Sequence, residues 1–285
     1  MSLDLSLFLL ALLGTSIAAG GVGAILGLGG GILLVPVLTV FFGVSLKYAM
    51  GASIVSIIAT SSGSAARYLR SRLSNLRIGL FLVLATTTGA ITGAHLAGVV
   101  PARGLELILG LTLAYSAFAT FRRIGVELPP TTLAADRWAV QLGHEGTYHD
   151  ARLRAEIPYR AHRVGWGFLA MFGAGVLSGL LGIGSGAFKV LALDALMRLP
   201  MKVSTATSNF MIGITAAASA GVYFTRGDVH PLVATPVAVG VLVGANAGTR
   251  LMARMRNQTV RKAFLPVLVY LAGSMLLRGL GIHLW

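Results

Sequence analysis

The sequence predicts an all-α integral membrane protein of about ten hydrophobic segments, arranged as two inverted-topology repeats of five segments each. The first observation is composition: hydrophobic residues make up 55% of the 285 residues and charged residues only 11%, whereas a soluble domain carries roughly 25% charged residues. The second is a sequence pattern that occurs twice, 155 residues apart. The third is an uneven distribution of basic residues, which sets the orientation of the segments.

The apolar segments follow one another along the chain, separated by more polar stretches. A membrane-spanning helix needs about 20 apolar residues. Two segments are shorter, 27–42 and 183–199, and each follows a glycine-rich break. They could be steep spans or the returning arms of re-entrant hairpins, which membranes allow only where protein or water covers the backbone. In order, the predicted segments are 5–25, 27–42, 48–66, 78–100, 104–121, 164–181, 183–199, 203–225, 231–249 and 263–281.

The doubled pattern begins with the glycine-rich break. Residues 26–31 read LGLGGG and residues 181–186 read LGIGSG, and each break is followed by a short apolar run. Doubled hydrophobic units that open with such interruptions are typical of transporters built from two repeats. Further matches at the same offset are Tyr68 with Tyr223, Gly89-xxx-Gly93 with Gly244-xxx-Gly248, and Ser53 with Ser208. We interpret the two GxxxG pairs as helix-packing faces.

These patterns divide the chain into three parts. Residues 1–121 form the first transmembrane repeat, 122–163 a cytoplasmic connector, and 164–285 the second, inverted repeat. The connector holds seven arginines, five acidic residues and three of the six histidines. We interpret it as a polar linker, with a short helix that Thr131 or Thr132 caps and that ends before Gly143.

A metal site in the connector is the alternative interpretation. It would use His144-Glu145 and His149-Asp150. A spacing of five residues does not place both imidazoles on one face of a helix, so we favour the linker.

Basic residues set the orientation. With both termini outside and the segments alternating, 18 lysines and arginines fall on the inside and four on the outside. The excess predicts cytoplasmic loops at 67–77, 122–163 and 250–262. Five segments per repeat is an odd number, so the second repeat must run in the opposite direction to the first.

Composition also excludes several functions. The net charge is +14, but the basic residues lie at the ends of apolar segments, so we expect no nucleic-acid partner. The absence of cysteine excludes disulfides and thiolate metal sites. Ser185 has Ile183 two positions before it and misses the GxSxG nucleophile elbow, and the first break fails the dinucleotide-binding pattern. We therefore expect no enzyme, no cofactor and no bound metal.

The two glycine breaks are the candidate substrate site. The residues concerned are Gly29, Gly30 and Gly31 in the first break, and Gly184, Ser185 and Gly186 in the second. A helix that starts after such a break presents unpaired N–H groups and a partial positive charge, and glycine lets a ligand approach the backbone closely. Two facing helix N-termini would bind an anion. The alternative is that the glycines serve close helix packing or a hairpin tip.

Polar side chains near the breaks extend this candidate site. Ser53, Ser208 and Asn209 offer hydroxyl and amide donors, although hydroxyls in membrane helices often bond to their own backbone. Lys189 lies in a hydrophobic segment, three residues past Gly186, and an intramembrane charge points to function. The alternatives for Lys189 are that it extends toward water or pairs with Asp194.

The arrangement resembles the TauE/SafE family of sulfite-exporter-like membrane transporter proteins. The resemblance rests on the LGxGGG-like break after the first segment, a downstream proline and a second copy after a basic loop. It carries over to Gly29, Gly30, Gly31 and Pro36 in the first copy and to Gly184 and Gly186 in the second. Ser185 departs by replacing a glycine, and Leu191 stands where Pro36 has its counterpart.

The resemblance implies a multi-pass permease of a bacterial-type cytoplasmic (inner) membrane, for sulfite, organosulfonates or related small anions. We expect transport by alternating access in a lipid bilayer, with the site between the breaks; the coupling ion and the oligomeric state stay open. The main alternative is a non-transporting membrane subunit that binds or assembles a partner protein, for example through 122–163. Breaks that face each other across a hydrated cavity would support transport, and breaks in dry packing would support the subunit.

Overall fold

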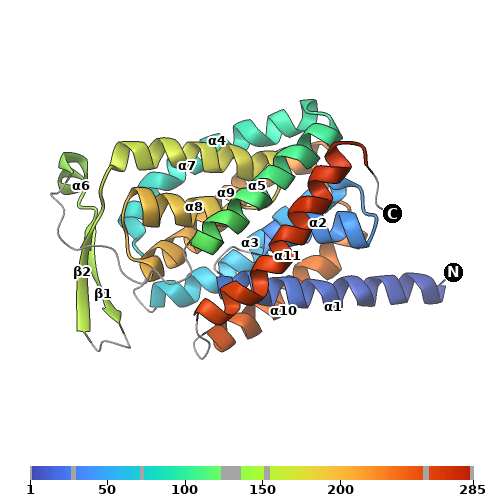
Figure 1. The fold of residues 1–285 in the computed structure, drawn as a ribbon, viewed down its shortest axis with the longest axis horizontal. Coiled ribbons are helices and arrows are strands. Elements are labelled where there is room, and N and C mark those ends of the chain that lie inside the picture. Colours follow the sequence, from blue (N-terminus) through green and yellow to red (C-terminus); the bar gives the residue numbers. More distant parts are fainter. Residues whose placement is uncertain are drawn as a thin grey trace.

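A computed structural model shows a long bundle of helices with a two-stranded sheet at one end (Figure 1). The model describes residues 2–26, 30–70, 74–122, 136–150, 155–252 and 257–282. The first half contains α1 (Ser2–Leu26), α2 (Gly31–Phe41), α3 (Leu46–Arg70), α4 (Leu76–Val99) and α5 (Ala102–Arg122). The connector contains α6 (Arg137–Gln141), β1 (Glu145–Asp150) and β2 (Ala155–Arg160). The second half contains α7 (Val164–Leu181), α8 (Gly186–Leu191), the π-helical turn η1 (Ala192–Leu196), α9 (Met201–Thr225), α10 (Pro231–Met252) and α11 (Asn257–Gly279).

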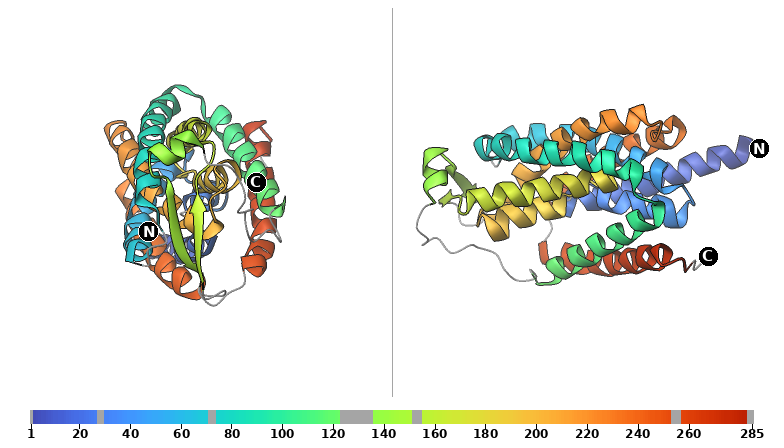
Figure 2. Two further views of the ribbon diagram at one scale, coloured as in Figure 1. Left: turned by 90° about the vertical axis from the view of Figure 1, so that its left-hand side faces the viewer. Right: turned by 90° about the horizontal axis from the view of Figure 1, so that it is seen from above.

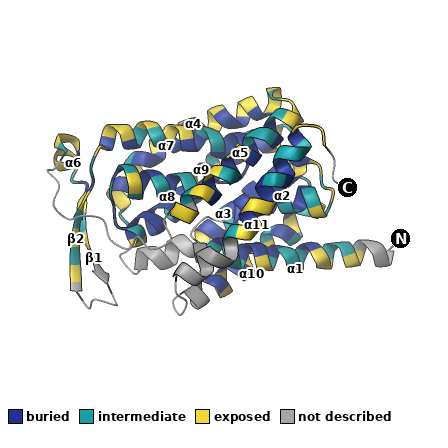
Figure 3. Cartoon of the chain, in the orientation of Figure 1, coloured by how far each residue is buried: buried dark blue, intermediate teal, exposed yellow. Residues whose placement is uncertain are grey.

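The prediction of an all-α integral membrane protein is confirmed. Each of the ten predicted hydrophobic segments coincides with helix in the structure. Of the described helices, α1, α4, α5, α7 and α10 are long and apolar enough to cross a membrane. Their outer faces carry exposed large apolar side chains, whereas buried residues fill the interior (Figure 3). A surface of this kind is stable where lipid, rather than water, covers it. Examples are Leu80, Leu84, Leu111, Trp166, Leu169 and Val239.

The two short segments are half-length helices. Helix α2 has 11 residues, and α8 and η1 together run over 186–196. At about 1.5 Å per residue, each covers about 16 Å, roughly half of a hydrocarbon core of about 30 Å. Lengths of this kind favour the re-entrant interpretation over steep full spans, and how the two segments sit in a membrane stays a prediction.

The two halves pack in equivalent ways. Helix α1 packs along α10, and its counterpart α7 packs along α4; α10 also contacts α3, as α4 contacts α9. The two remaining large contacts, α3 with α9 and α5 with α11, join counterparts to each other. Figure 2, in its right panel, shows α4 beside α7 and α5 beside α11. The pattern of contacts is the same when the two halves are exchanged, which is expected of two structural repeats. Their inverted orientation in a membrane stays a prediction.

The glycine pairs are helix-packing faces, as predicted. A Cβ atom added at Gly89 or Gly93 of α4 would collide with backbone atoms of α7. One added at Gly244 or Gly248 of α10 would collide with backbone atoms of α1. Only glycine allows the helix backbones to approach this closely.

The connector is more ordered than a simple linker. Strands β1 and β2 form an antiparallel hairpin, which the sequence analysis did not predict. Helix α6 ends before Gly143, as predicted, but its cap is Asp136, whose side chain accepts a hydrogen bond from the Trp138 amide. The predicted caps, Thr131 and Thr132, lie outside the described residues.

The described parts of two loops predicted to be cytoplasmic, 67–77 and 122–163, meet at the hairpin end. The Asn75 amide, just before α4, donates to the hydroxyl of Tyr159 on β2 over 3.1 Å. The His162 amide donates to the carbonyl oxygen of Met197, between η1 and α9, over 3.0 Å. Helix α1 begins and α11 ends at the opposite end of the bundle (Figure 1). This grouping agrees with the orientation that the basic residues predict, and the side of the membrane that each end faces stays a prediction.

Candidate functional site

The second glycine break has a left-handed backbone. Gly182 has φ 65°, Gly184 has φ 71°, and Ser185 has φ 44°. Glycine adopts such angles without steric cost, whereas serine is strained there. In the first break, Gly30 has φ 75°, so the position that Ser185 occupies has a positive φ in both halves. Gly27, Leu28 and Gly29 lie outside the described residues, so the candidate site residue Gly29 is among those that the structure does not describe.

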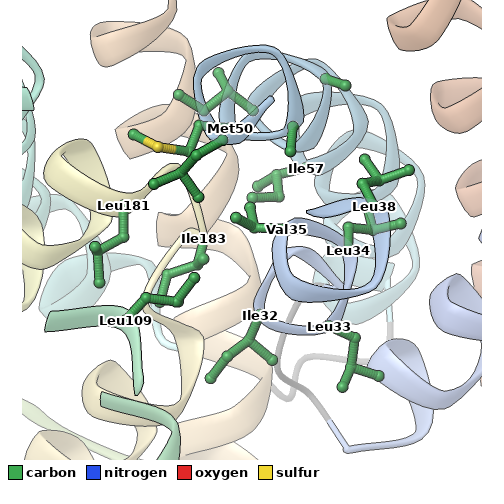
Figure 4. Packing of buried hydrophobic residues seen from close by; sticks show 14 of the residues in the cluster. Ile32, Leu33, Leu34, Val35, Leu38, Met50, Ile57, Leu109, Leu181 and Ile183 are labelled. Atoms are coloured by element: carbon green, nitrogen blue, oxygen red, sulfur yellow. The ribbon is translucent and has the colours of Figure 1, made fainter. Parts of the chain in front are cut away.

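The two breaks meet in the core of the bundle. A Cβ atom added at Gly31 would lie 2.9 Å from the carbonyl oxygen of Ile183 in the second break, and would also collide with the side chain of Ile57. A Cβ atom added at Gly184 would lie 3.1 Å from the side chains of both Ile57 and Ile212. The contact between the breaks is thus close and apolar. Figure 4 shows Ile57 and Ile183 near the first turn of α2.

This packing bears on the sequence analysis in two ways. The breaks come together, as the doubled pattern suggested, but an isoleucine side chain rather than a hydrated cavity lies at their contact. Ile57 and Ile183 were not among the predicted site residues, because apolar residues in an apolar segment carry no signal of their position. Any ligand that reaches both breaks must displace these side chains.

Ser53 and Ser208 hold the half-length helices. The Ser53 hydroxyl, on α3, donates to the carbonyl oxygen of Gly31 in the first turn of α2 over 3.4 Å. The Ser208 hydroxyl, on α9, donates to the carbonyl oxygen of Gly186 in the first turn of α8 over 3.4 Å. Both serines are fully buried. The structure therefore places them beside the breaks, bound across to another helix and not to their own backbone.

Ser185 and Asn209 occupy different surroundings. The Ser185 hydroxyl donates to the carbonyl oxygen of Ala174 on α7 over 2.5 Å, which ties the second break to the preceding helix. Asn209 is 5% exposed, and its carbonyl oxygen accepts a hydrogen bond from the hydroxyl of Ser61 on α3. The side-chain amide of Asn209 has no hydrogen-bond partner in the part of the chain that the structure describes.

Lys189 is fully buried. Its ammonium group donates to the hydroxyl of Thr215 on α9 over 3.0 Å. The Thr215 hydroxyl donates to the carbonyl oxygen of Met211 over 2.7 Å and lies 3.0 Å from the hydroxyl of Thr86 on α4. Because Lys189 is fully buried, it does not extend toward water, and the hydrogen bond of its ammonium group goes to Thr215. The sequence analysis missed Thr86 and Thr215, since hydroxyls are common in membrane helices.

The two departures from the family pattern have structural consequences. Ser185 shares a positive φ with its counterpart Gly30, although the ψ angles differ (32° and −32°), and it adds the bond to α7. Pro36 lies inside α2, whereas at its counterpart Leu191 the α-helix ends and the π-helical turn begins. π-Helical turns are rare in proteins, and those that do occur are often found at functional sites.

The fold and the breaks together define a class of protein. Short helices that begin at glycine breaks in a helical membrane protein resemble the discontinuous helices found in many membrane transporters. A family model described as "Sulfite exporter TauE/SafE" matches residues 12–275, so the chain belongs to this family and is a membrane transporter. This confirms the resemblance found in the sequence.

Two curated proteins of Bacillus subtilis (strain 168) are similar along their whole length. One, described as "Probable membrane transporter protein YunE", is 26% identical over 284 residues, which cover 97% of this chain and 99% of that protein. The other, "Probable membrane transporter protein YdhB", is 27% identical over 283 residues, covering 97% and 100%. No solved structure matches the chain.

Proposed function

We propose that the protein is a permease that moves a small anion, such as sulfite or an organosulfonate, across the cytoplasmic membrane by alternating access. One observation carries the proposal: two glycine breaks at equivalent places in the sequence meet in the core, and each starts a half-length helix. A polar backbone at membrane depth is tolerated only where it serves a covered or hydrated site. The family's description as sulfite exporters supports an oxyanion as the substrate.

The first turns of α2 and α8 supply the donors in this proposal. The amides of Gly31 and Gly186 lie at helix starts, where N–H groups have no partner within the helix. Helix starts also carry a partial positive charge, which favours anions. Asn209 adds an amide that is free to bond, and Lys189 adds a full positive charge one turn past Gly186.

By the criterion given in the sequence analysis, an apolar contact between the breaks favours the non-transporting subunit. Alternating access accounts for the same contact as one closed state of a transporter. In the present arrangement the side chain of Ile57 fills the space beside Gly31 and Gly184. For an anion to enter, α3 must carry Ile57 away from the second break. Because α3 crosses α9 at this point, a rocking movement of one half against the other would open the contact, as transporters with paired repeats do.

The test is uptake into proteoliposomes that contain the purified full chain, measured for sulfite, thiosulfate, sulfate and short sulfonates. We expect saturable uptake of at least one of these anions, and loss of that uptake in Gly184→Val protein that is inserted to the same level. Uptake no faster than in protein-free liposomes for every anion would overturn the proposal. That result, together with a stable complex with another membrane protein, would favour the alternative of a non-transporting subunit.

A further inference from the structure

A polar cluster lies between three helices beside the second break. It consists of Lys189 on α8, Thr215 on α9 and Thr86 on α4, and none of the three side chains is exposed. The Lys189 ammonium lies 3.0 Å from the Thr215 hydroxyl, which lies 3.0 Å from the Thr86 hydroxyl. Helices far apart in the sequence thus bring one charge and two hydroxyls together inside an otherwise apolar bundle.

The ammonium group has unused hydrogen-bonding capacity. A lysine ammonium carries three N–H donors, and Thr215 is the one acceptor that Lys189 has within the described ranges. The Thr215 hydroxyl donates its proton to the Met211 carbonyl oxygen. The Thr86 hydroxyl donates to the Val83 carbonyl oxygen over 3.2 Å. Hydroxyl protons rotate freely, so both can turn toward a new acceptor. An oxyanion would provide the acceptors that the cluster lacks.

No other charged residue lies close to Lys189 along the helices that carry the cluster. Helix α7 has no ionisable side chain. On α9, the ionisable residues nearest Thr215 are Tyr223, eight residues later, and Lys202, thirteen residues earlier. On α4, Arg77 and His95 are each nine residues from Thr86. At about 1.5 Å per residue these groups lie about 12–20 Å away along the helix axes.

The remaining neighbours of α8 are engaged in other contacts. On α5, the Tyr115 ring stacks on Phe188, and Glu106 forms an ion pair with Arg278 over 3.5 Å. Asp194, on the following π-helical turn, has a polar contact of its own, and the Lys189 ammonium bonds to Thr215. The cluster therefore contains a single positive charge and no negative one.

The first half of the chain lacks this cluster. The counterparts of Lys189, Thr215 and Thr86 at the offset of 155 residues are Leu34, Thr60 and Val241. Leu34 and Val241 are buried apolar residues, so the equivalent place holds one hydroxyl and no charge. The protein can therefore hold only one such site per chain, despite its repeated architecture.

We propose that Lys189, Thr215 and Thr86 bind one singly charged oxyanion, such as a sulfonate or hydrogen sulfite, and discriminate against doubly charged anions such as sulfate. One buried positive charge balances one negative charge. A dianion would leave a net negative charge in a low-dielectric interior, which is strongly unfavourable. This inference rests on the proposed anion transport and specifies its substrate class.

Methanesulfonate and sulfate separate charge from shape, because both have a tetrahedral sulfur with oxygen ligands but carry one and two charges. Sulfite itself is unsuitable, since it interconverts with hydrogen sulfite near neutral pH. Binding of each anion to the purified full chain is measured by calorimetry at fixed ionic strength. We expect methanesulfonate to bind at least about tenfold more tightly than sulfate.

Variants of the three cluster residues test whether they bind methanesulfonate. Lys189→Met removes the charge-assisted bond and is expected to weaken methanesulfonate binding about ten- to a hundredfold, while Lys189→Arg keeps the charge and part of the affinity. Thr215→Val and Thr86→Val are expected to weaken binding several-fold. Thr60→Val removes the equivalent buried hydroxyl of the first half, which bonds to the Ser56 and Ile57 carbonyls of its own helix, and is the matched control with unchanged affinity. Thermal melting confirms that each variant is folded.

The outcomes separate this inference from the proposed function. Equal affinity for sulfate and methanesulfonate, or undiminished binding by folded Lys189→Met, would overturn the site while leaving anion transport in place. Failure of every anion to bind or to enter proteoliposomes would overturn both. Discrimination by charge that is lost in Lys189→Met and kept in Thr60→Val supports the site.

Discussion

The Ser208 hydroxyl donates a hydrogen bond of 3.4 Å to the carbonyl oxygen of Gly186, 22 residues earlier in the chain. The same bond, with the same length and sequence separation, joins Ser53 to Gly31 in the first half. Each half-length helix is therefore held at its first turn by the long helix that follows it. Because α3 and α9 also cross each other, the two breaks are linked through these bonds to one central contact.

We predict that Ser53→Ala and Ser208→Ala each reduce stability slightly. A net hydrogen bond contributes about 0.5–1.5 kcal/mol, and a length of 3.4 Å places these two at the lower end of that range. The measurement is thermal melting of purified protein. Ser62→Ala is the control, because the Ser62 hydroxyl is exposed and bonds to its own helix. If Ser62→Ala lowers stability as much as Ser53→Ala or Ser208→Ala, the two buried serines have no specific role.

The overall architecture could be predicted because it depends on hydropathy, which each segment carries by itself. The limits of α7, 164–181, coincide with the predicted segment. The helix-packing role of Gly89 and Gly93 could be predicted as well, since close approach requires glycine regardless of the partner helix. Such features are local, and a single sequence contains them.

The remaining features of the site depend on which helices pack against each other, and a single sequence does not contain that information. Ile57 is one of many apolar residues in its segment, and its place between the breaks follows from the crossing of α3 with α9. Thr86 and Thr215 lie 129 residues apart and are joined only by tertiary packing. The hairpin of β1 and β2 was missed because its strands are short and polar, so they lack the apolar alternation that indicates a strand.

Valine at the breaks is predicted to abolish transport. At Gly184, φ 71° is unfavourable for a branched side chain, and a Cβ atom would already press on Ile57 and Ile212. At Gly30, φ is 75° and the nearest contact is 3.4 Å, so backbone strain dominates there. Transport of the anion identified in the uptake panel is measured for Gly30→Val and Gly184→Val at matched levels of inserted protein.

The control for this experiment is Gly173→Val. Gly173 lies in α7, and an added Cβ atom would meet nothing within 4 Å. We expect this variant to transport at the parental rate. If the two break variants insert normally and also transport at that rate, the glycines serve packing alone and the site lies elsewhere.

The orientation of the bundle can be tested with single cysteines, because the chain has none of its own. Thr147, on β1 at the hairpin end, and Ser45, between α2 and α3, are both exposed. The excess of basic residues predicts that the hairpin end is cytoplasmic. In intact cells an impermeant thiol reagent should label Ser45→Cys and spare Thr147→Cys until the membrane is broken. The reverse pattern would overturn the predicted orientation.

The packing of the connector hairpin is predicted to weaken at acidic pH through His144. This histidine is buried, its ring lies 5.2 Å from that of Phe81, and its Nδ1 atom has no partner among the described residues. Burial lowers the pKa of His144 below its ordinary value of 6.5. The unfolded connector therefore takes up a proton first as the pH falls, so stability is complete above about pH 6.5 and declines below it.

Hydrogen exchange at Ala161 reports this change directly, because the Ala161 amide donates to the His144 carbonyl over 2.9 Å. We expect its protection factor to fall between about pH 7.5 and pH 5.5 in the parent protein. In His144→Phe the ring stays apolar at every pH, so protection should be the same at both values. Equal protection at both pH values in the parent would show that His144 stays neutral or that the hairpin does not depend on it.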